Sequence, residues 1–472
     1  MEPIVVLFED HAAEDFRPLS WSLPVYEIRC GMLALRERVQ HLAGEEKPGL
    51  LPRRLLLPLQ RASAADGAAV GTDACRPRVA QAGALYLNAR LGPDWSQLAA
   101  LLAAGSDADW AWWESDSLLA CRLAPEPALA FLDAWATWDA DADRAGIWTA
   151  GRRRAPRFVP APARSGPTVA GRRPVSAPTT AGIPPAFAHL WDIVAALGPA
   201  IAADAPRICG GELPLRRRLF GIAADPAAWP AGAPWETGGS FGPLSERTGV
   251  SVVGGPVWTG PETRIAPGVV VDAGPGPVVL DRAVTVQPHV YLQGPLYVGP
   301  GAIIKAGARI YGETSIGVGC RVAGEIGESL CLDFGNKQHD GFIGHAALGS
   351  WVNLGAGTTC SDLKNNYGPV RVDYGLGEID SGRRFVGLMM GEHGKSAIGS
   401  LFNTATVVGY ASNVFGAGFP PKYLPNFSWG DPGGPRFDGA RAAEVARVVT
   451  ARRGCLFGPE QAALLAALAA DA

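Results

Sequence analysis

A period of six residues in the second half of the chain constrains its fold more than any other feature of the sequence. Glycine follows several of the repeated aliphatic residues, and small residues, including Ala302 and Cys320, stand four places after them. A six-residue period fits neither the 3.6-residue period of a helix nor the two-residue alternation of a strand. The repeated residues are Leu280, Val286, Leu292, Val298, Ile304, Ile310, Ile316 and Val322.

This period predicts a solenoid in which each flat face takes one hexad and three faces close a coil. The aliphatic residue points into the coil, and the small residue turns the corner. The register resumes at Leu348 and runs to Val414, so we predict a left-handed parallel β-helix over residues 250–430. Antiparallel strands with glycine turns are the alternative. Breaks in the period at Glu325–Asp340 and Lys364–Lys395 predict loops, which commonly carry function.

The first half of the sequence predicts an α/β domain over residues 1–245. Residues 152–181 are rich in Arg, Pro, Gly, Ser and Thr, which is typical of a linker. Two further helices, Gly439–Ala451 and Pro459–Ala470, are expected within residues 436–472. In the α/β domain the expected strands are Ile4–Phe8, Leu55–Leu59, Ala84–Asn88 and Ser117–Leu123, and the expected helices are Tyr26–Leu42, Trp95–Ala104 and Pro184–Ala203.

Charge and cysteine content exclude several classes of protein. The net charge of −3 is not that of a general nucleic-acid or membrane-surface binder. Eight cysteines are scattered without any CxxC pair, so neither a zinc ribbon nor a thioredoxin motif is indicated. The N-terminus lacks the basic segment of a signal peptide, and no stretch approaches the roughly 20 apolar residues of a spanning helix. We therefore expect a reduced, cytoplasmic protein that does not bind membranes.

Five segments carry a resemblance to a known family. LFED and FRPLSWSLPVYEIRCGMLALRERV stand near the start, and GNKQHDGFIGHAALGSWVNLGAGTTCSDLKNNYGPVRV stands in the repeat. GKSAIGSLFNTATVVG and FGAGFPPKYLPNFSWG follow. Together they resemble the bifunctional N-acetylglucosamine-1-phosphate uridyltransferase/glucosamine-1-phosphate acetyltransferase family, in an alternative bacterial form. The segment from about residue 90 to about residue 250 matches only weakly.

The resemblance implies two transfer reactions. This family acetylates glucosamine 1-phosphate with acetyl-CoA and then couples the product to UTP, with release of pyrophosphate. It therefore implies a nucleotidyltransferase-like N-terminal domain, an acyltransferase-like solenoid and Mg²⁺ for nucleotidyl transfer. The implied partners are a sugar phosphate, a nucleoside triphosphate and acetyl-CoA. The implied assembly is a homotrimer whose acetyl-transfer sites lie between adjacent solenoids.

The resemblance also assigns roles in acetyl transfer. His339 falls at the position of the general base, and a near-neutral imidazole suits removal of a proton from an attacking amine. Asn353 matches a position near the sugar, and Ala356 and Ser400 match positions along the acetyl-CoA channel. Further candidates for contacts with the sugar or its phosphate are Lys337, Lys395, Asn365, Asn366 and Tyr367.

The sequence departs from the family pattern around this site. Phe342 stands where the family has a tyrosine, and the SDLKNNYG segment replaces a different loop. A surface role for His339 and turn or solvated roles for the lysines and asparagines are the alternatives. Zinc bound by three histidines is another alternative, although their spacing does not match the carbon dioxide hydratases of this fold. Those histidines are His289, His339 and His345.

The N-terminal half lacks the glycine-rich phosphate loop of the ordinary family and has FEDHAAEDFRPLSWSLP in its place. Arg17 and Arg29 are candidates for binding the triphosphate, with structural salt bridges as the alternative. Arg90 stands where the family has a metal-binding aspartate. Asp94 or another acid could replace that aspartate, arginines could hold the phosphates instead, or this half could have lost catalysis.

The sequence thus predicts a two-domain enzyme of nucleotide-sugar synthesis with both activities. A monofunctional transferase with the other domain degenerate is the second interpretation. A non-catalytic trimer that binds nucleotide sugars is the third.

Overall fold

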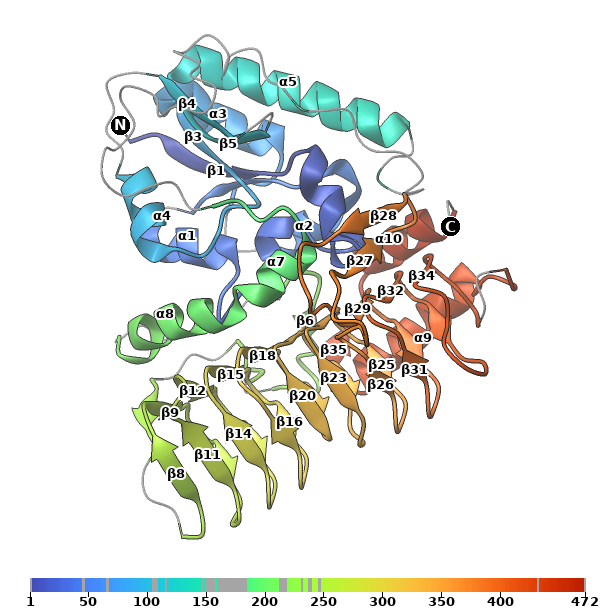
Figure 1. The fold of residues 1–472 in the computed structure, drawn as a ribbon. Helices are drawn as coiled ribbons and strands as arrows, with labels where there is room; N and C mark the ends of the chain where they lie inside the picture. Colours follow the sequence, from blue (N-terminus) through green and yellow to red (C-terminus); the bar gives the residue numbers. More distant parts are fainter. Residues whose placement is uncertain are drawn as a thin grey trace.

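The computed structural model describes residues 2–44, 47–64, 68–103, 109–114, 117–145, 148, 158, 185–211, 219–230, 232–236, 240–244, 248–430 and 433–470. An N-terminal α/β part lies over a long C-terminal solenoid, and helices α7 (Leu190–Ala195) and α8 (Leu197–Cys209) run between them (Figure 1). The predicted linker, residues 152–181, lies outside the described residues except for the buried Phe158.

The N-terminal part is built on a mixed five-stranded sheet with the order β2-β1-β3-β5-β4. Strand β1 is parallel to β2 and β3, whereas β5 is antiparallel to β3 and β4. Ile4 and Phe8 of β1 face one core and Leu7 faces another, because successive side chains alternate between the faces of a sheet. The strands are β1 (Ile4–Phe8), β2 (Gly49–Leu51), β3 (Ala84–Asn88), β4 (Trp110–Glu114) and β5 (Ser117–Leu123).

Helices cover both faces of this sheet. Helices α1 (Leu35–Ala43) and α4 (Trp95–Leu102) pack on the face of Leu7. Helices α3 (Thr72–Ala82) and α5 (Pro125–Arg144) pack on the opposite face. Shorter elements are η1 (His11–Phe16), η2 (Leu19–Trp21), η3 (Val25–Glu27), η4 (Arg54–Leu56) and α2 (Leu57–Ser63).

Three predicted elements of this half were wrong or only partly right. Leu55–Leu59 is helical (η4 and α2) and the strand lies at Gly49–Leu51, because Pro58 suits a first helical turn and a short apolar run does not distinguish a strand from a buried helix. Only the second half of Tyr26–Leu42 is α-helical. Pro184–Ala203 contains two helices, α7 and α8, with a break at Ala196 before Pro199, which lacks an N–H to extend α7.

The solenoid consists of three sheets, one per face, which successive strands visit in turn (Figure 1). The first face comprises β7 (Gly242–Pro243), β9 (Val257–Thr259), β12 (Val278–Leu280), β15 (Leu296–Val298), β18 (Thr314–Ile316), β21 (Leu330–Cys331), β24 (Ala347–Leu348), β29 (Met389–Met390), β32 (Val407–Val408) and β34 (Tyr423–Leu424). The second comprises β10 (Arg264–Ile265), β13 (Thr285–Val286), β16 (Ile303–Ile304), β19 (Arg321–Val322), β22 (Asn336–Lys337), β25 (Asn353–Leu354), β30 (Lys395–Ser396) and β33 (Asn413–Val414). The third comprises β8 (Ser251–Gly254), β11 (Val270–Ala273), β14 (Tyr291–Gln293), β17 (Arg309–Ile310), β20 (Glu325–Gly327) and β23 (Phe342–Gly344), with the pair β26 (Thr359–Cys360) and β31 (Leu401–Phe402) beside β23.

The solenoid has about 10 turns and is consistent with the predicted left-handed β-helix. All eight aliphatic residues of the repeat are at most 2% exposed, as expected for side chains that point into the coil. The break predicted at Glu325–Asp340 was wrong, because β20, β21 and β22 pair with the coils on both sides. A shortened corner therefore disturbs the sequence period without interrupting the solenoid.

The second predicted break contains an excursion from the solenoid. The antiparallel hairpin of β27 (Arg371–Asp373) and β28 (Glu378–Asp380) rises toward the N-terminal part (Figure 1). The chain is back in the first face at β29, so Lys395 belongs to the solenoid and not to the loop.

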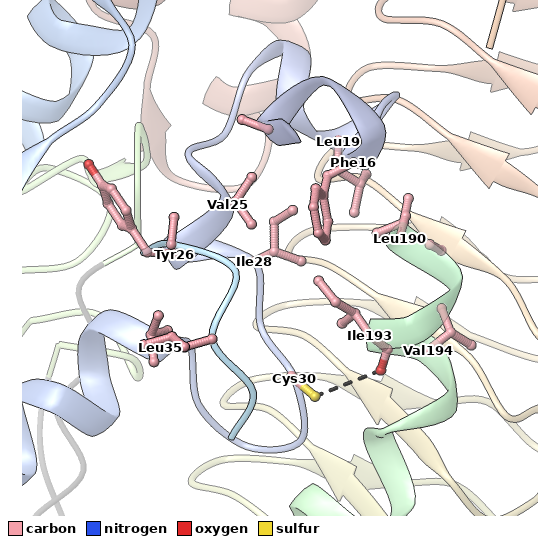
Figure 2. Packing of buried hydrophobic residues seen from close by; sticks show 14 of the residues in the cluster. Phe16, Leu19, Val25, Tyr26, Ile28, Cys30, Leu35, Leu190, Ile193 and Val194 are labelled. Atoms are coloured by element: carbon pink, nitrogen blue, oxygen red, sulfur yellow. Dashed lines mark hydrogen bonds between the residues drawn. The ribbon is translucent and has the colours of Figure 1, made fainter. Parts of the chain in front are cut away.

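A shared core joins the two parts of the molecule. Side chains of α7, including Ile193, pack against Phe16 and Ile28 of the N-terminal part (Figure 2). The same cluster continues into the solenoid through Leu330 and into the hairpin through Val372. The N-terminal part is therefore packed against the solenoid and is not a separate module on a tether.

Arg29 adds a buried polar connection across this junction. Its Nε donates to Ser315 Oγ at 3.1 Å, its Nη1 to Asp333 Oδ1 at 3.1 Å and its Nη2 to the carbonyl of Cys331 at 2.9 Å. All of these acceptors lie on the solenoid, so one guanidinium fixes the position of the N-terminal part on it.

The chain ends in helices α9 (Gly439–Ala451) and α10 (Pro459–Ala470), which occupy the ranges predicted for two terminal helices. Their apolar faces pack with Leu59 and with Phe427 of a solenoid corner. Between them, β35 (Cys455–Leu456) pairs with β6 (Ala223–Ala224). Among the described residues, no helix has the length and apolar character needed to cross a bilayer.

We predict that Arg29→Ala lowers the free energy of unfolding by roughly 3–5 kcal/mol, because it leaves the buried Asp333 carboxylate without its cation. The midpoint of urea unfolding measures this loss. Arg309→Ala is the matched control, since the Arg309–Glu325 pair is exposed and is expected to contribute less than roughly 1 kcal/mol. Equal losses in the two variants would contradict the role of Arg29 at the junction.

Candidate functional site

Charged residues gather where the parallel strands of the N-terminal sheet end. Glu9 follows β1 and accepts from the backbone N–H of Arg53, at 3.1 Å, and from its Nε, at 3.2 Å. Asp10 accepts from Asn88 Nδ2 at 2.8 Å and from Arg90 Nη2 at 3.3 Å. The carboxyl ends of parallel strands are the usual place for ligands in α/β sheets, so this edge is the candidate nucleotide site.

Arg90, which replaces the expected aspartate, has an unused donor at this edge. Its Nη1 donates to the carbonyl of Phe187 at 3.0 Å, in addition to the contact with Asp10. Within the described residues its buried Nε has no hydrogen-bond partner. A buried unsatisfied donor is costly, and a phosphate oxygen is one acceptor that would satisfy it.

The two arginines predicted to bind the triphosphate are engaged elsewhere. Arg17 is buried, pairs with Glu14 at 2.7 Å and lies 4.3 Å above the Trp21 ring. Arg29 belongs to the junction with the solenoid. Asp94 accepts from the backbone N–H groups of Ser96 and Gln97 and caps α4. The alternative of structural contacts therefore fits Arg17 and Arg29 better, and Asp94 serves as the N-cap of α4.

Among the described residues, protein side chains alone do not form a site for Mg²⁺. No group of three or more histidine, cysteine or acidic side chains in the described part of the chain could hold a metal ion. The two carboxylates at the sheet edge, Glu9 and Asp10, are each paired with an arginine. His289, His339 and His345 likewise do not form a group that could hold zinc.

The solenoid brings three predicted residues of the acetyl-transfer site to one corner. His339 follows β22, Ala356 follows β25 and Ser400 follows Lys395–Ser396 of β30, each at the corner between the second and third faces. Hydrogen bonds stack these turns: Gly357 N–H donates to the carbonyl of Asp340 at 3.0 Å, and Gly399 N–H donates to that of Ala356 at 2.7 Å. His339 is exposed, and this exposed column is the candidate acetyl-transfer site.

Asn353 and Lys395 lie beside this corner, on the outer side of the second face. They are in register as neighbours, and Asn336 on the other side donates through Nδ2 to Asn353 Oδ1 at 2.5 Å. Burial lowers the pKa of Lys395 to about 8, which still leaves the ammonium mostly charged at neutral pH. Lys395 Nζ donates to the carbonyl of His393 at 2.9 Å. The two asparagine amides and this ammonium are therefore the polar groups along the outer side of the second face.

Lys337 does not lie on this surface. It occupies the inward position of its hexad, in register with Val322, and is buried. Its Nζ donates to the carbonyls of Ala323 and His339, at 2.9 and 2.8 Å. The position predicted to bind phosphate is thus a buried lysine that holds the backbone of the His339 corner.

Asn365, Asn366 and Tyr367 lie on the excursion, which leaves from a different corner, between the third and first faces. All three are exposed, and Asn366 Oδ1 accepts from Gly368 N–H at 3.1 Å, as in a turn. Within one chain, the structure does not bring these three residues to the corner of His339.

Sequence reasoning missed a pair of residues at that other corner. His345 Nδ1 lies 2.8 Å from Asp362 Oδ2. The two residues are 17 positions apart, about one coil, as are Asn336 and Asn353. This spacing of one coil could have predicted the pair from the sequence, because residues at equivalent places in successive coils stack on one another.

Residues 5–212 match the model of the family described as sugar nucleotidyl transferase. The match contains the N-terminal sheet, the charged edge and helices α7 and α8, and it stops before the solenoid. The chain matches no curated protein. The molecule thus combines a nucleotidyltransferase-like N-terminal part with a C-terminal parallel β-solenoid.

The interior position of Lys337 predicts a pH dependence of stability. Burial lowers its pKa from 10.5 to about 8, so between these pH values the unfolded chain binds more protons than the folded chain. Stability from this group therefore rises with pH across that window. Wild type should gain free energy of unfolding relative to Lys337→Met as the pH rises from 8 to 10.5, measured by urea unfolding at each pH.

Lys305→Met, at a half-buried position of the solenoid, is the matched control. Its free energy of unfolding should differ from that of wild type by a constant amount over this pH range. A constant difference between wild type and Lys337→Met would show that the Lys337 ammonium is solvated.

Proposed function

We propose that this protein is a nucleotide-sugar enzyme that acetylates glucosamine 1-phosphate with acetyl-CoA and transfers a uridylyl group from UTP to the product, N-acetylglucosamine 1-phosphate. The observation that carries the proposal is the match of residues 5–212 to the sugar nucleotidyl transferase family, joined in one chain to a solenoid of a kind typical of acyltransferases. The shared core at the junction supports two activities in one rigid enzyme.

The nucleotidyl half of the proposal rests on the charged sheet edge. Glu9 and Asp10 orient Arg53 and Arg90 there, and the unsatisfied Nε of Arg90 is the proposed donor to a phosphate oxygen. An arginine can stabilise the negative charge that develops on a transferring phosphoryl group. Mg²⁺ is proposed as part of this reaction from the family resemblance alone.

We predict that Arg90→Lys raises the Kd for UTP roughly 10- to 150-fold, because lysine keeps the charge but lacks the Nε donor. Calorimetric titration with UTP measures the change, and acetyl transfer should be unaffected. Arg76→Lys is the control, since the Arg76–Asp133 pair is exposed on the surface. Unchanged UTP affinity in Arg90→Lys would move the triphosphate site away from this edge.

The acetyl-transfer half rests on the column at the His339 corner. In the proposed reaction the amine nitrogen attacks the thioester carbonyl and the C–N bond forms. The C–S bond breaks, and the sulfur of coenzyme A takes up the proton that the amine loses, so coenzyme A leaves as the thiol. His339 accepts the amine proton, and Asn353 and Lys395 hold the sugar and its phosphate. Ala356 and Ser400 line the path of acetyl-CoA.

A trimer is part of this proposal. Ile398, which is 82% exposed, and Leu401 stand next to Ser400 on this corner. Apolar side chains exposed together often mark an interface. A second copy of the chain would cover them and complete a site that one corner leaves open.

We predict that His339→Ala lowers the rate of acetyl transfer about 10²- to 10⁴-fold, the usual contribution of a positioned general base. Release of free thiol from acetyl-CoA with glucosamine 1-phosphate measures the rate. Sedimentation should show the same assembly as wild type. His289→Ala, at an exposed solenoid corner, is the matched control and should retain the wild-type rate. A wild-type rate of acetyl transfer in His339→Ala would show that His339 is not the general base.

A second candidate function is acetyl transfer alone, with a first domain that only binds a nucleotide or sugar. The balanced charges at the sheet edge favour it, since Glu9 and Asp10 neutralise Arg53 and Arg90. Pyrophosphate release from UTP and N-acetylglucosamine 1-phosphate separates the two functions. A protein that releases neither pyrophosphate nor thiol would be a non-catalytic binding trimer.

A further inference from the structure

A cavity of about 340 Å³ lies at the junction, away from both sites described above. Its volume falls in the range of small-ligand pockets, roughly 300–1,000 Å³. Three elements enclose it: helix α7, a corner of the solenoid and the end of the hairpin excursion. It is lined by Trp191, Val194, Ala195, Glu313, Glu328, His345, Gly382, Arg383, Arg384 and Phe385.

The solenoid wall is a column of polar side chains. Glu313, Glu328 and His345 take the same place in successive coils, as backbone hydrogen bonds from Glu328 to Gly312 and from His345 to Gly327 show. His345 Nδ1 lies 2.8 Å from Asp362 Oδ2 and 4.0 Å from Glu328 Oε2. Burial raises the pKa of Glu328, His345 lowers it, and Asp362 and Glu313 raise it further. The carboxylates of Asp362 and Glu328 thus share the imidazole of His345.

The excursion closes the cavity from the other side and is held at two points. Arg383 Nη2 donates to Asp192 Oδ1 of α7 at 2.8 Å, and the Phe385 ring stacks on His345 with a centroid distance of 4.9 Å. Among the described residues, the buried Nε of Arg383 has no hydrogen-bond partner. Arg384 is exposed and contributes a second guanidinium.

We propose that this cavity is a second ligand site, for a small zwitterion that carries an ammonium group together with a phosphate or carboxylate. The cavity wall carries two glutamates and two arginines, and Asp192 pairs with one of these arginines, Arg383. A ligand with both an ammonium and an anionic group therefore complements the wall better than a ligand with a single charge. The glutamate column recognises the ammonium, and the Arg383 Nε and Arg384 recognise the anion. The rings of Trp191 and Phe385 pack against the body of the ligand. The site does not depend on either proposed reaction.

Titration calorimetry on the full chain tests this proposal with four probes. Glucosamine 1-phosphate and L-serine carry both charges and distinguish phosphate from carboxylate. Glucose 1-phosphate lacks the ammonium, and glucosamine lacks the anion. We expect at least one zwitterion to bind more tightly than both singly charged probes. Amide hydrogen exchange locates the binding, which should slow exchange in residues 382–386 and 190–195.

Glu328→Gln and Arg384→Gln should each weaken that binding by about tenfold or more, as expected for loss of a charge-assisted hydrogen bond. Glu262→Gln is the matched control, a glutamate at another solenoid corner with the same left-handed backbone, and should bind as wild type. Thermal unfolding verifies that each variant is folded. The proposal is overturned if no zwitterion binds, or if Glu328→Gln and Arg384→Gln both bind as wild type. It is also overturned if protection appears only at residues 339–341, which would assign the ligand to the acetyl-transfer corner. Thiol release from acetyl-CoA tests that reaction independently.

Discussion

The stacking of one coil on the next determines which side chains of the solenoid meet. Backbone hydrogen bonds between coils repeat down each face, so residues about one coil apart become neighbours regardless of the residues between them. This constraint brings His339, Ala356 and Ser400 to one corner. It also aligns Asn336, Asn353 and Lys395 on the adjacent face.

The same constraint separates residues that are close in sequence. Lys337 and His339 are two residues apart, yet one is inside the coil and the other is exposed at the corner. His345 and Asp362 meet at another corner, where the chain soon leaves for the excursion. A solenoid can therefore carry different polar sites on different edges.

The junction gives the molecule a feature that neither part has alone. Arg29 is used by Ser315, Asp333 and the carbonyl of Cys331, and α7 packs on both the N-terminal part and the solenoid. A motif that distinguishes the N-terminal sequence, FRPLSWSLPVYEIRCG, thus contributes to the interface through Arg29. It also contributes to the charged sheet edge through Val25, whose N–H donates to Glu9 Oε1 at 2.9 Å. Arg29 could be mistaken for a phosphate ligand from the sequence, because its charge alone does not identify its partner.

The sequence by itself determined the solenoid, the strands Ile4–Phe8, Ala84–Asn88 and Ser117–Leu123, and the terminal helices. These elements follow from local periodicity, which is a property of the chain. The short apolar run at Leu55–Leu59 misled the prediction, because such a run is compatible with either a strand or a buried helix. Pro58, which suits the first turn of a helix, was the sign of the helix that forms there.

Only the tertiary structure decided how the charged residues are paired. Arg17 is buried beside Glu14, Arg90 is directed to Asp10, and Lys337 points into the coil. It also formed the cavity at His345 from segments more than a hundred residues apart, helix α7 and the solenoid. Long-range packing sets these contacts, and the free energy of burying a charge depends on partners that local sequence does not specify.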